Sequence, residues 1–262
     1  MKDRVEQTHK DTVRAVDRMI DILETFSFEK PEMTLSEIHV SADLPKTTAY
    51  RILTTLEQRN MVVLDSETGK YRLGYDIVKM GCIAQIGNSL QRASMKDMEM
   101  ISAETEQTCN LYVRDGMERM CIAQVEGPQY VKRFSFLGAR FPLYCGAGKL
   151  LLAYSPAEFQ RQYFERMTLE KCTENTRTVP EQLESELSLI RERGYAVSLG
   201  ERDALTAAVC VPVYDYSNKV VATVTVSGPI YLFTEENVAR YLKTLKKGAA
   251  AISKRLGSQH TH

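Results

Sequence analysis

The sequence predicts an α+β protein with two domains joined by a helix, and three observations support this prediction. Residues 10–74 show helical apolar spacing, a helix-capping signal and a terminal hairpin pattern, which together indicate a winged helix-turn-helix. Residues 75–91 keep a helical period and predict a linker helix. In residues 92–257, strand-like runs come in hairpins with helices at intervals, which favours an antiparallel sheet over a parallel one.

The first two helices of the N-terminal domain are predicted from apolar spacing and a capping signal. The following apolar residues recur at the spacing of one helical face: Val13, Val16, Ile20 and Leu23. Residues 26–31, FSFEKP, end this helix. Thr34 and Glu37 then stand three residues apart, which is the spacing of a capping box before a short second helix.

The third helix and the wing follow a turn at residues 41–45. Pro45 is accepted early in the first turn of a helix, because its missing N–H has no intrahelical partner there. The helix stops near Asn60, and its predicted inward side chains are Ala49, Ile52, Leu53 and Leu56. Residues 61–64 and 71–73 flank a six-residue turn and predict a β-hairpin.

The second domain is predicted to alternate between hairpins and helices. Asp115-Gly116 is a hairpin turn signal between the first two strands. The expected strands are 110–114, 118–125, 130–136, 195–199, 207–214 and 220–227. The expected helices are 94–105, 147–154, 157–164, 181–193 and 235–255.

Composition excludes several classes of protein. The 34 basic and 34 acidic side chains cancel, so the chain lacks a uniformly basic surface for nucleic acid. The four histidines are His9, His39, His260 and His262, so a histidine base or histidine metal ligand is excluded from residues 40–259. No metal and no cofactor are expected.

The cysteines and the terminus indicate a reducing compartment. All six cysteines are at least 12 residues apart, so none has a zinc or redox spacing, and buried thiols are expected. Residues 1–12 are charged and do not form a signal peptide, and no apolar run reaches the length of a membrane span. We therefore expect a cytoplasmic protein without membrane contact.

The exposed face of the third helix suggests DNA binding. Long donors and short hydroxyls suit phosphate oxygens and base edges in a major groove, and free N–H groups in the first turn, at Thr47 and Thr48, favour a phosphate. The helix residues expected to contact DNA are Lys46, Thr47, Thr48, Tyr50, Arg51 and Thr54. Lys70 and Arg72 in the hairpin would reach a neighbouring groove or backbone.

The charge of the N-terminal domain argues against strong binding by one copy. Residues 1–80 contain 12 basic and 14 acidic side chains, a net charge of −2 by subtraction, although release of counterions usually dominates affinity for DNA. Most of these acidic residues lie outside the third helix. We therefore expect a dimer that doubles the contacts and reads two half-sites.

Six segments together resemble the IclR (isocitrate lyase regulator) family of bacterial transcription regulators, over nearly the whole chain. In the first domain they are 13–18 (VRAVDR), 44–57 (LPKTTAYRILTTLE) and 71–74 (YRLG). In the second they are 146–149 (GAGK), 191–198 (RERGYAVS) and 226–229 (VSGP). The resemblance implies a winged helix-turn-helix that binds double-stranded operator DNA, with Ser36 among its contacts. It also implies a GAF-like α/β effector-binding domain and a homodimer or dimer of dimers.

The resemblance further implies a pocket for a small organic acid in the second domain. Small residues in the loop 145–149 would let a ligand approach the backbone at a helix start, where N–H groups favour an anion. The period of two places Thr225 and Ser227 on one face of a strand. The expected effector-binding residues are Phe141, Gly146, Ala147, Ser198, Ala208, Thr225 and Ser227. The expected function is a ligand-responsive regulator, a repressor of a catabolic operon.

Two departures from the family pattern and two competing classes stay open. Residues 142–146 are one position shorter than usual, with Tyr144 where a histidine is frequent, and Ala204-Leu205 replaces a Pro-Gly pair.

The alternative is an enzyme that modifies a small molecule through Cys145, with Lys149 and a helix start activating the thiolate. Glu201 and Asp203 are compatible with a metal ion, but a carboxylate pair of this spacing on a loop is more often solvated. A dimerisation module that does not touch DNA would leave the third-helix face unexplained.

Overall fold

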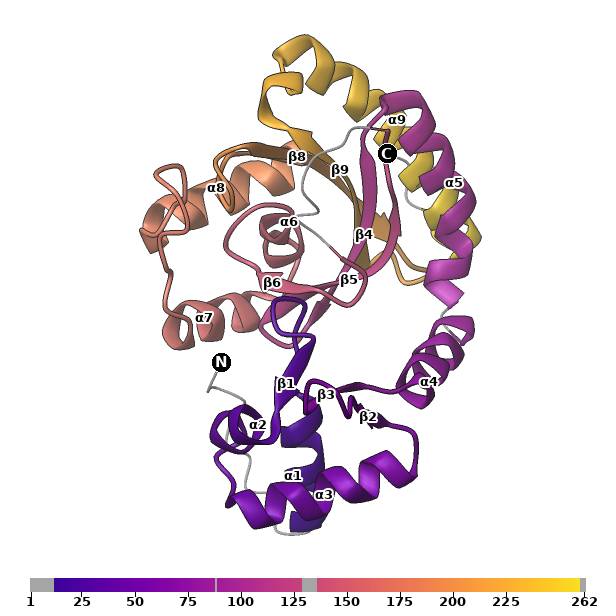
Figure 1. Ribbon diagram of the computed structural model, residues 1–262. Coiled ribbons are helices and arrows are strands. Elements are labelled where there is room, and N and C mark those ends of the chain that lie inside the picture. Colours follow the sequence, from indigo (N-terminus) through magenta and orange to yellow (C-terminus); the bar gives the residue numbers. More distant parts are fainter. Residues whose placement is uncertain (1–11, 88, 129–135, 260–262) are drawn as a thin grey trace. The chain divides into compact units, whose positions relative to one another are not determined.

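A computed structural model describes residues 12–87, 89–128 and 136–259, and the chain divides into two compact units between Gly87 and Asn88 (Figure 1). Each unit is described by itself. Among the described residues, no helix combines the length and apolarity needed to cross a membrane.

Unit 1 has the predicted three helices and a wing, one additional strand, and the helix predicted as a linker over 75–91, which ends at Ile86. Its elements are α1 (Arg14–Leu23), β1 (Glu32–Thr34), α2 (Leu35–Ser41), α3 (Lys46–Gln58), β2 (Val62–Leu64), β3 (Lys70–Leu73) and α4 (Tyr75–Ile86). The three strands form an antiparallel sheet in the order β1-β3-β2. The sequence missed β1 because three residues are too short to show a period of two, and pairing with distant β3 creates the strand.

The capping box of α2 is confirmed. The Glu37 N–H donates to Oγ1 of Thr34 at 3.3 Å, and the Thr34 N–H donates to a carboxylate oxygen of Glu37 at 2.8 Å. This backbone hydrogen bond lowers the pKa of the Glu37 carboxyl. The cap orients α2 so that Ile38 enters the core of unit 1, which also holds Leu53 and Leu56 of α3.

The apolar face predicted for α1 is exposed at its N-terminal end, whereas Leu23 at its C-terminal end packs against the core of unit 1. Val13 is 64% exposed and Val16 is 45% exposed, whereas Ile22 is fully buried in the core. The helix packs on the core through its C-terminal part, with Met19, Ile22 and Leu23. An exposed apolar stripe on a helix is typical of a contact surface.

Unit 2 contains a six-stranded antiparallel sheet, which confirms the predicted fold class. Its strands are β4 (Thr108–Asp115), β5 (Glu118–Val125), β6 (Arg140–Pro142), β7 (Ala196–Leu199), β8 (Thr206–Tyr214) and β9 (Val220–Pro229), in the order β6-β5-β4-β9-β8-β7. The strand expected at 130–136 falls outside the described residues up to position 135, and β6 forms the edge beside β5.

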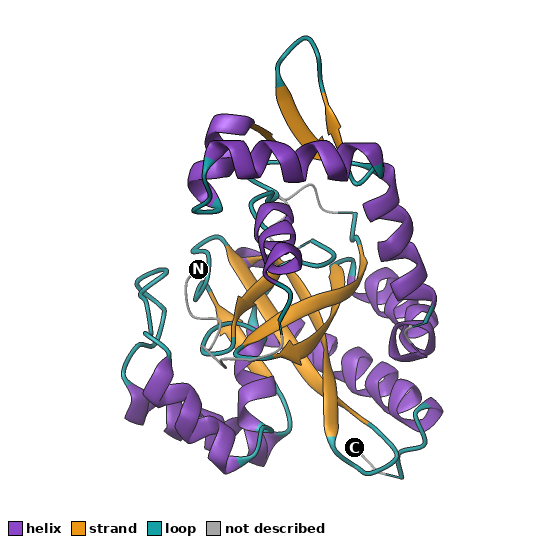
Figure 2. Ribbon diagram, turned by 90° about the horizontal axis from the view of Figure 1, so that it is seen from below, coloured by secondary structure: helices purple, strands orange, loops and turns teal. Residues whose placement is uncertain are grey.

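Helices cover both faces of this sheet (Figure 2). They are α5 (Ser89–Thr105), α6 (Gly148–Ala153), α7 (Ala157–Arg166), α8 (Pro180–Arg193) and α9 (Glu235–Arg255), with a 3-10 turn at Ile230–Leu232. Helices α5 and α9 lie side by side and bury one face through Ile101 and Leu245, together with Val224 of β9. Helices α6 and α8 pack near Cys210 on the opposite face. The helix expected from Ser94 begins five positions earlier, at Ser89.

We expect the substitution Thr34→Ala to lower the free energy of unfolding of unit 1 by about 1 kcal/mol, because the Glu37 N–H loses its acceptor. Urea unfolding of the full chain, followed by helical circular dichroism, measures the change. Thr34→Ser keeps the hydroxyl acceptor and serves as the matched control. Equal unfolding midpoints for both variants would contradict a stabilising role for the cap.

Candidate functional site

The predicted DNA-contact residues of α3 share one exposed face. Thr47, Tyr50, Arg51 and Thr54 follow the helical spacing i, i+3, i+4 and i+7. Thr47, Tyr50 and Arg51 are exposed, whereas Thr54 is half-buried and its hydroxyl donates to the Tyr50 carbonyl at 3.0 Å. The donor of Thr54 is therefore used within the helix, and Tyr50 and Arg51 are the longest polar side chains of this face.

The start of α3 differs from its prediction at Thr48. The Thr48 N–H donates to the Pro45 carbonyl at 2.9 Å, so it is not a free donor, and its side chain is half-buried. The prediction of a free N–H group at Thr48 is wrong because Pro45 begins the helix with a tight turn. Lys46 and Thr47 remain exposed at this helix start.

The wing places two further cations on a rigid hairpin. A carboxylate oxygen of Asp65 accepts the N–H groups of Glu67 and Thr68 at 2.8 and 3.1 Å, which locks the turn. Lys70 is exposed and Arg72 is half-buried on β3. The remaining predicted contact, Ser36, is exposed in the first turn of α2.

The strand register of unit 2 brings four predicted effector residues onto one face of the sheet. Ser198 of β7 pairs with Ala208 of β8, and Ala208 pairs with Ser227 of β9. Thr225 lies two positions before Ser227 on the same face, next to Cys210. We call Ser198, Ala208, Thr225 and Ser227, together with Asn110, the polar sheet face.

Asn110 is a member of the polar sheet face that the sequence did not reveal. It is fully buried on β4 and pairs with Thr225. Its amide nitrogen donates to Oγ of Ser227 at 3.0 Å, and its amide oxygen accepts from Gln124 at 2.8 Å. The available signal was a polar residue flanked by Cys109 and Leu111 in a predicted strand. Side chains alternate between the two faces of a sheet, so Asn110 is expected on the opposite face from its two neighbours.

The Thr225 hydroxyl is buried without a partner. The residue is only 1% exposed, and its Oγ1 makes no hydrogen bond with the described residues. A buried hydroxyl without a hydrogen bond costs about 1–3 kcal/mol, so such groups usually have a partner in the functional state. The polar sheet face therefore contains one hydroxyl whose hydrogen-bonding capacity is not used by the described residues.

The other three predicted effector residues lie around a buried arginine. Phe141 lies between Arg119 and Arg202, whose guanidinium carbons are 5.1 and 4.1 Å from its ring centroid. Arg119 is 3% exposed and donates to the carbonyls of Pro142 and Cys145. Its Nε has no partner among the described residues. Desolvation, followed by the charge of Arg119, lowers the pKa of Arg202.

Two glycines of the loop 145–149 lie against Arg119 and the neighbouring backbone. A Cβ atom at Gly148 would lie 2.6 Å from a guanidinium nitrogen of Arg119 and 2.6 Å from the Pro142 carbonyl oxygen, and one at Gly146 would lie 3.1 Å from the other guanidinium nitrogen. Gly146 additionally has a positive φ of 62°, which favours glycine. These glycines leave room for Arg119 beside the loop backbone, and the approach of a ligand to this loop stays a prediction. Ala147 beside them is buried.

The anion bound by this loop is a carboxylate of the same chain. The Gly146 N–H donates to Oε2 of Glu201 at 2.9 Å, and Lys149 is ion-paired with Oε1 of the same residue. Glu201 is buried, so the prediction that the Glu201 and Asp203 pair is solvated is wrong for Glu201. Asp203 accepts the Leu205 N–H and stabilises the turn.

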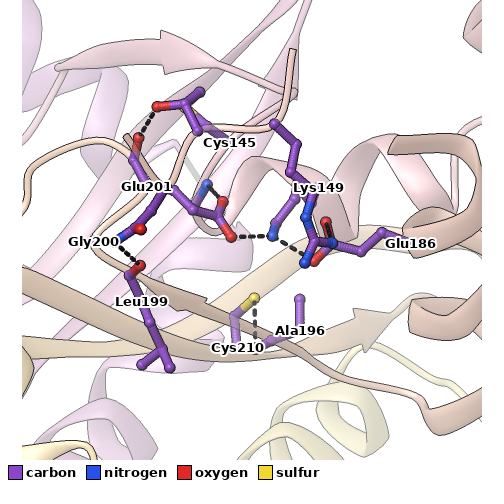
Figure 3. Close-up of polar contacts among 12 residues, drawn as sticks. Cys145, Lys149, Glu186, Ala196, Leu199, Gly200, Glu201 and Cys210 are labelled. Carbon is purple, nitrogen blue, oxygen red and sulfur yellow. Dashed lines mark hydrogen bonds and ion pairs between the residues drawn. The ribbon is translucent and has the colours of Figure 1, made fainter. Parts of the chain in front are cut away.

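Lys149 is the centre of a buried ion network (Figure 3). Its side chain is 1% exposed and lies between the carboxylates of Glu186 and Glu201, with Nζ 2.6 Å from Glu186 Oε1. Arg177 pairs with the other oxygen of Glu186 at 2.6 Å. We call Lys149, Glu186 and Glu201, together with the half-exposed Arg177, the buried ion network. Its two cations and two carboxylates are balanced.

This arrangement excludes the enzymatic alternative based on Cys145 and Lys149. The Lys149 ammonium is occupied by two carboxylates, and burial raises the pKa of the Cys145 thiol. A thiol protonated in this way is not an activated nucleophile. In the part of the chain that the structure describes, no group of three His, Cys, Asp or Glu side chains forms a metal site.

We expect Lys149→Met to lower the free energy of unfolding by about 3–5 kcal/mol, because two buried carboxylates lose their shared cation. Thermal and urea unfolding of the full chain measure the loss. The control is Lys171→Met, which removes an exposed ion pair with Glu174 and changes stability by less than about 1 kcal/mol. A similar small change in both variants would show that the network is not stabilising.

Comparison with known proteins matches both units to a single family. The family profile described as the IclR helix-turn-helix domain matches residues 15–66, and the profile described as the bacterial transcriptional regulator IclR C-terminal domain matches residues 87–254. The regulator KipR of Bacillus subtilis is 30% identical over 229 residues, which cover 87% of this chain and 91% of KipR. The repressor AllR of Escherichia coli is 30% identical and covers 93% of this chain and 90% of its own.

Solved structures show the same fold. An IclR transcriptional regulator from Alicyclobacillus acidocaldarius superposes with a TM-score of 0.85 at 29% identity, covering 95% of this chain and all of that one. An IclR homologue from Microbacterium hydrocarbonoxydans, complexed with 4-hydroxybenzoate, superposes with a TM-score of 0.81 at 23% identity. It covers 92% of this chain and 98% of that one.

Proposed function

The chain belongs to the IclR family of bacterial transcriptional regulators, and on that premise we propose that it represses a catabolic operon until a small organic acid binds unit 2. As a helix-turn-helix regulator it binds DNA and is not an enzyme. It would act in the cytoplasm, on double-stranded operator DNA.

The unpartnered Thr225 hydroxyl is the observation that supports a ligand on the polar sheet face. Thr225 lies beside Asn110 and two positions from Ser227, so a bound carboxylate or hydroxyl would meet several polar groups from neighbouring strands. Arg119, which is buried and donates to the carbonyls of Pro142 and Cys145, adds positive charge beside the loop 145–149. An excess of cations favours an anionic effector.

Exposed apolar faces on α1 and α4 support a homodimer, with a dimer of dimers as its further assembly. On α1 they include Val13 and Val16, and on α4 they include Tyr75, Val78 and Ile83. Exposed apolar stripes of this kind are typical of contact surfaces between chains. Pairing would present two α3 helices to half-sites about 10 base pairs apart, or a multiple of that.

The proposed switch is a shift between two arrangements of the paired DNA-binding units, transmitted through α4. The effector must then bind free and operator-bound dimers with different affinity, because the two equilibria are linked.

We expect Arg51→Ala to weaken operator binding by about 1–3 kcal/mol, roughly 5- to 150-fold in Kd, if the guanidinium contacts a base. The operator is first recovered from genomic DNA with the purified protein, and Kd is then measured by fluorescence anisotropy at two salt concentrations. Arg59→Ala removes an exposed arginine just past the end of α3 and is the matched control. Unchanged affinity of the Arg51 variant would refute this placement of α3.

We expect Thr225→Val to weaken effector binding about tenfold without loss of stability, because the lost hydroxyl has no partner among the described groups. Small carboxylic acids, including 4-hydroxybenzoate, are screened by thermal shift and quantified by calorimetry. Thr223→Val is the matched control, since its buried hydroxyl donates to the Val211 carbonyl at 3.1 Å. The control should lose stability and keep its affinity for the effector. If Thr223→Val weakened effector binding and Thr225→Val did not, the proposed site would be refuted.

A further inference from the structure

Unit 2 has a hollow at the opposite end of β8 and β9 from the polar sheet face. It has a volume of about 960 Å³ and is lined by Tyr214 at the end of β8 and Val220 at the start of β9. Val220 and Thr225 are five residues apart on one strand, which corresponds to roughly 16 Å. We call this hollow the basic pocket.

The lining of the basic pocket has an excess of positive charge. Its five cationic residues are Arg114, Arg191, Arg193, Lys219 and Lys246, and its one carboxylate is Glu192. The formal sum of these six side chains is five minus one, or +4. Within the described ranges, the ion pairs of unit 2 involve other cations, such as Arg140, Arg177 and Arg255.

Neutral groups hold the three arginines in place. Arg191 donates to the Ala153 carbonyl at 3.2 Å and to the Ser188 hydroxyl at 2.8 Å. Arg193 donates to the Tyr195 carbonyl at 2.7 Å and lies over that ring, with its guanidinium carbon 4.7 Å from the centroid. The Arg114 guanidinium carbon lies 4.2 Å from the ring centroid of Phe159. These contacts orient the guanidinium groups without neutralising them.

The basic pocket differs from the buried ion network because it has too few carboxylates to balance its cations. In the buried ion network, Lys149 and Arg177 are matched by two carboxylates, whereas the basic pocket gathers like charges whose mutual repulsion is unfavourable. Oriented guanidinium groups make strong paired hydrogen bonds to phosphate and carboxylate oxygens. A ligand with several negative charges would relieve the repulsion.

The rest of the lining suits an organic body attached to the anion. Tyr154 and Tyr214 form an edge-to-face pair with ring centroids 6.2 Å apart, and Leu151, Pro156 and Pro212 add apolar surface. A volume of about 960 Å³ far exceeds that of a bare phosphate and agrees with pockets for organic ligands. An aromatic wall next to guanidinium groups favours a planar ring bearing a charged group.

We propose that the basic pocket binds a phosphorylated small molecule with two or more negative charges and a planar or apolar body. The site is separate from the effector site on the polar sheet face, since the two occupy opposite ends of β8 and β9. It does not depend on the identity of the effector, so either proposal can fail without the other.

The test is calorimetric titration of the full chain at about 0.15 M salt, where weak long-range attraction is screened. Three probes test the contributions of the negative charge and of the organic body of the ligand. ADP has both, pyrophosphate has only the charge, and adenosine has only the body. We expect ADP to bind most tightly, pyrophosphate more weakly and adenosine not at all. The double variant Arg191→Gln/Arg193→Gln should weaken ADP binding at least tenfold, and Lys246→Gln should weaken it severalfold.

Matched variants distinguish the basic pocket from other cationic surfaces of the chain. Lys247→Gln changes the exposed neighbour of Lys246 that does not line the pocket, and Lys46→Gln removes a cation from α3. Thr225→Val alters the effector site. All three should bind ADP as the unmodified protein does, and thermal midpoints confirm that every variant is folded.

Three results would overturn the proposal. The first is the absence of saturable binding of ADP and pyrophosphate by the unmodified protein. The second is an equal loss of binding in the Lys46 variant, which would assign the anion to the DNA-binding surface. The third is that the arginine double variant sediments with a different mass from the unmodified protein when no ADP is present. That result would make the pocket a contact between two copies of the chain.

Discussion

The buried contact of Lys149 with Glu186 and Glu201 connects three segments of unit 2. It joins α6, α8 and the loop after β7, and Glu201 also accepts the Gly146 N–H. Removing an ammonium and two carboxylates from water is unfavourable, so the arrangement is stable only while every member keeps its partner. This requirement holds the loop 145–149 over the sheet in one conformation.

The cationic side chains of unit 2 are held in two ways: some are paired with carboxylates, and others are held by neutral groups. The buried ion network is neutral, because two carboxylates balance Lys149 and Arg177. Arg119 is held instead by the carbonyls of Pro142 and Cys145, as the arginines of the basic pocket are held by neutral groups. Cations oriented by neutral acceptors keep their charge available for an anion from outside the chain.

Unit 1 shows how a protein of zero net charge is built to bind DNA. Its capped helix α2 and the Asp65 turn of the wing order two polar surfaces, on α3 and on β3. Each surface holds few cations, which is the reason for the proposed pairing of two chains on DNA. The exposed apolar side chains of Val13 and Val16 at the start of α1 are consistent with that proposal.

The sequence by itself determined the helices of unit 1, the antiparallel hairpins and the family, since helical period, capping residues and turn signals act over a few neighbouring residues. Only the tertiary structure decided the partners of Asn110, Arg119 and Glu201. Glu201 meets Gly146 across 55 positions of the chain, and Asn110 meets Ser227 across 117. Sequence spacing does not encode such contacts, because strand register and burial select which distant polar groups share one place.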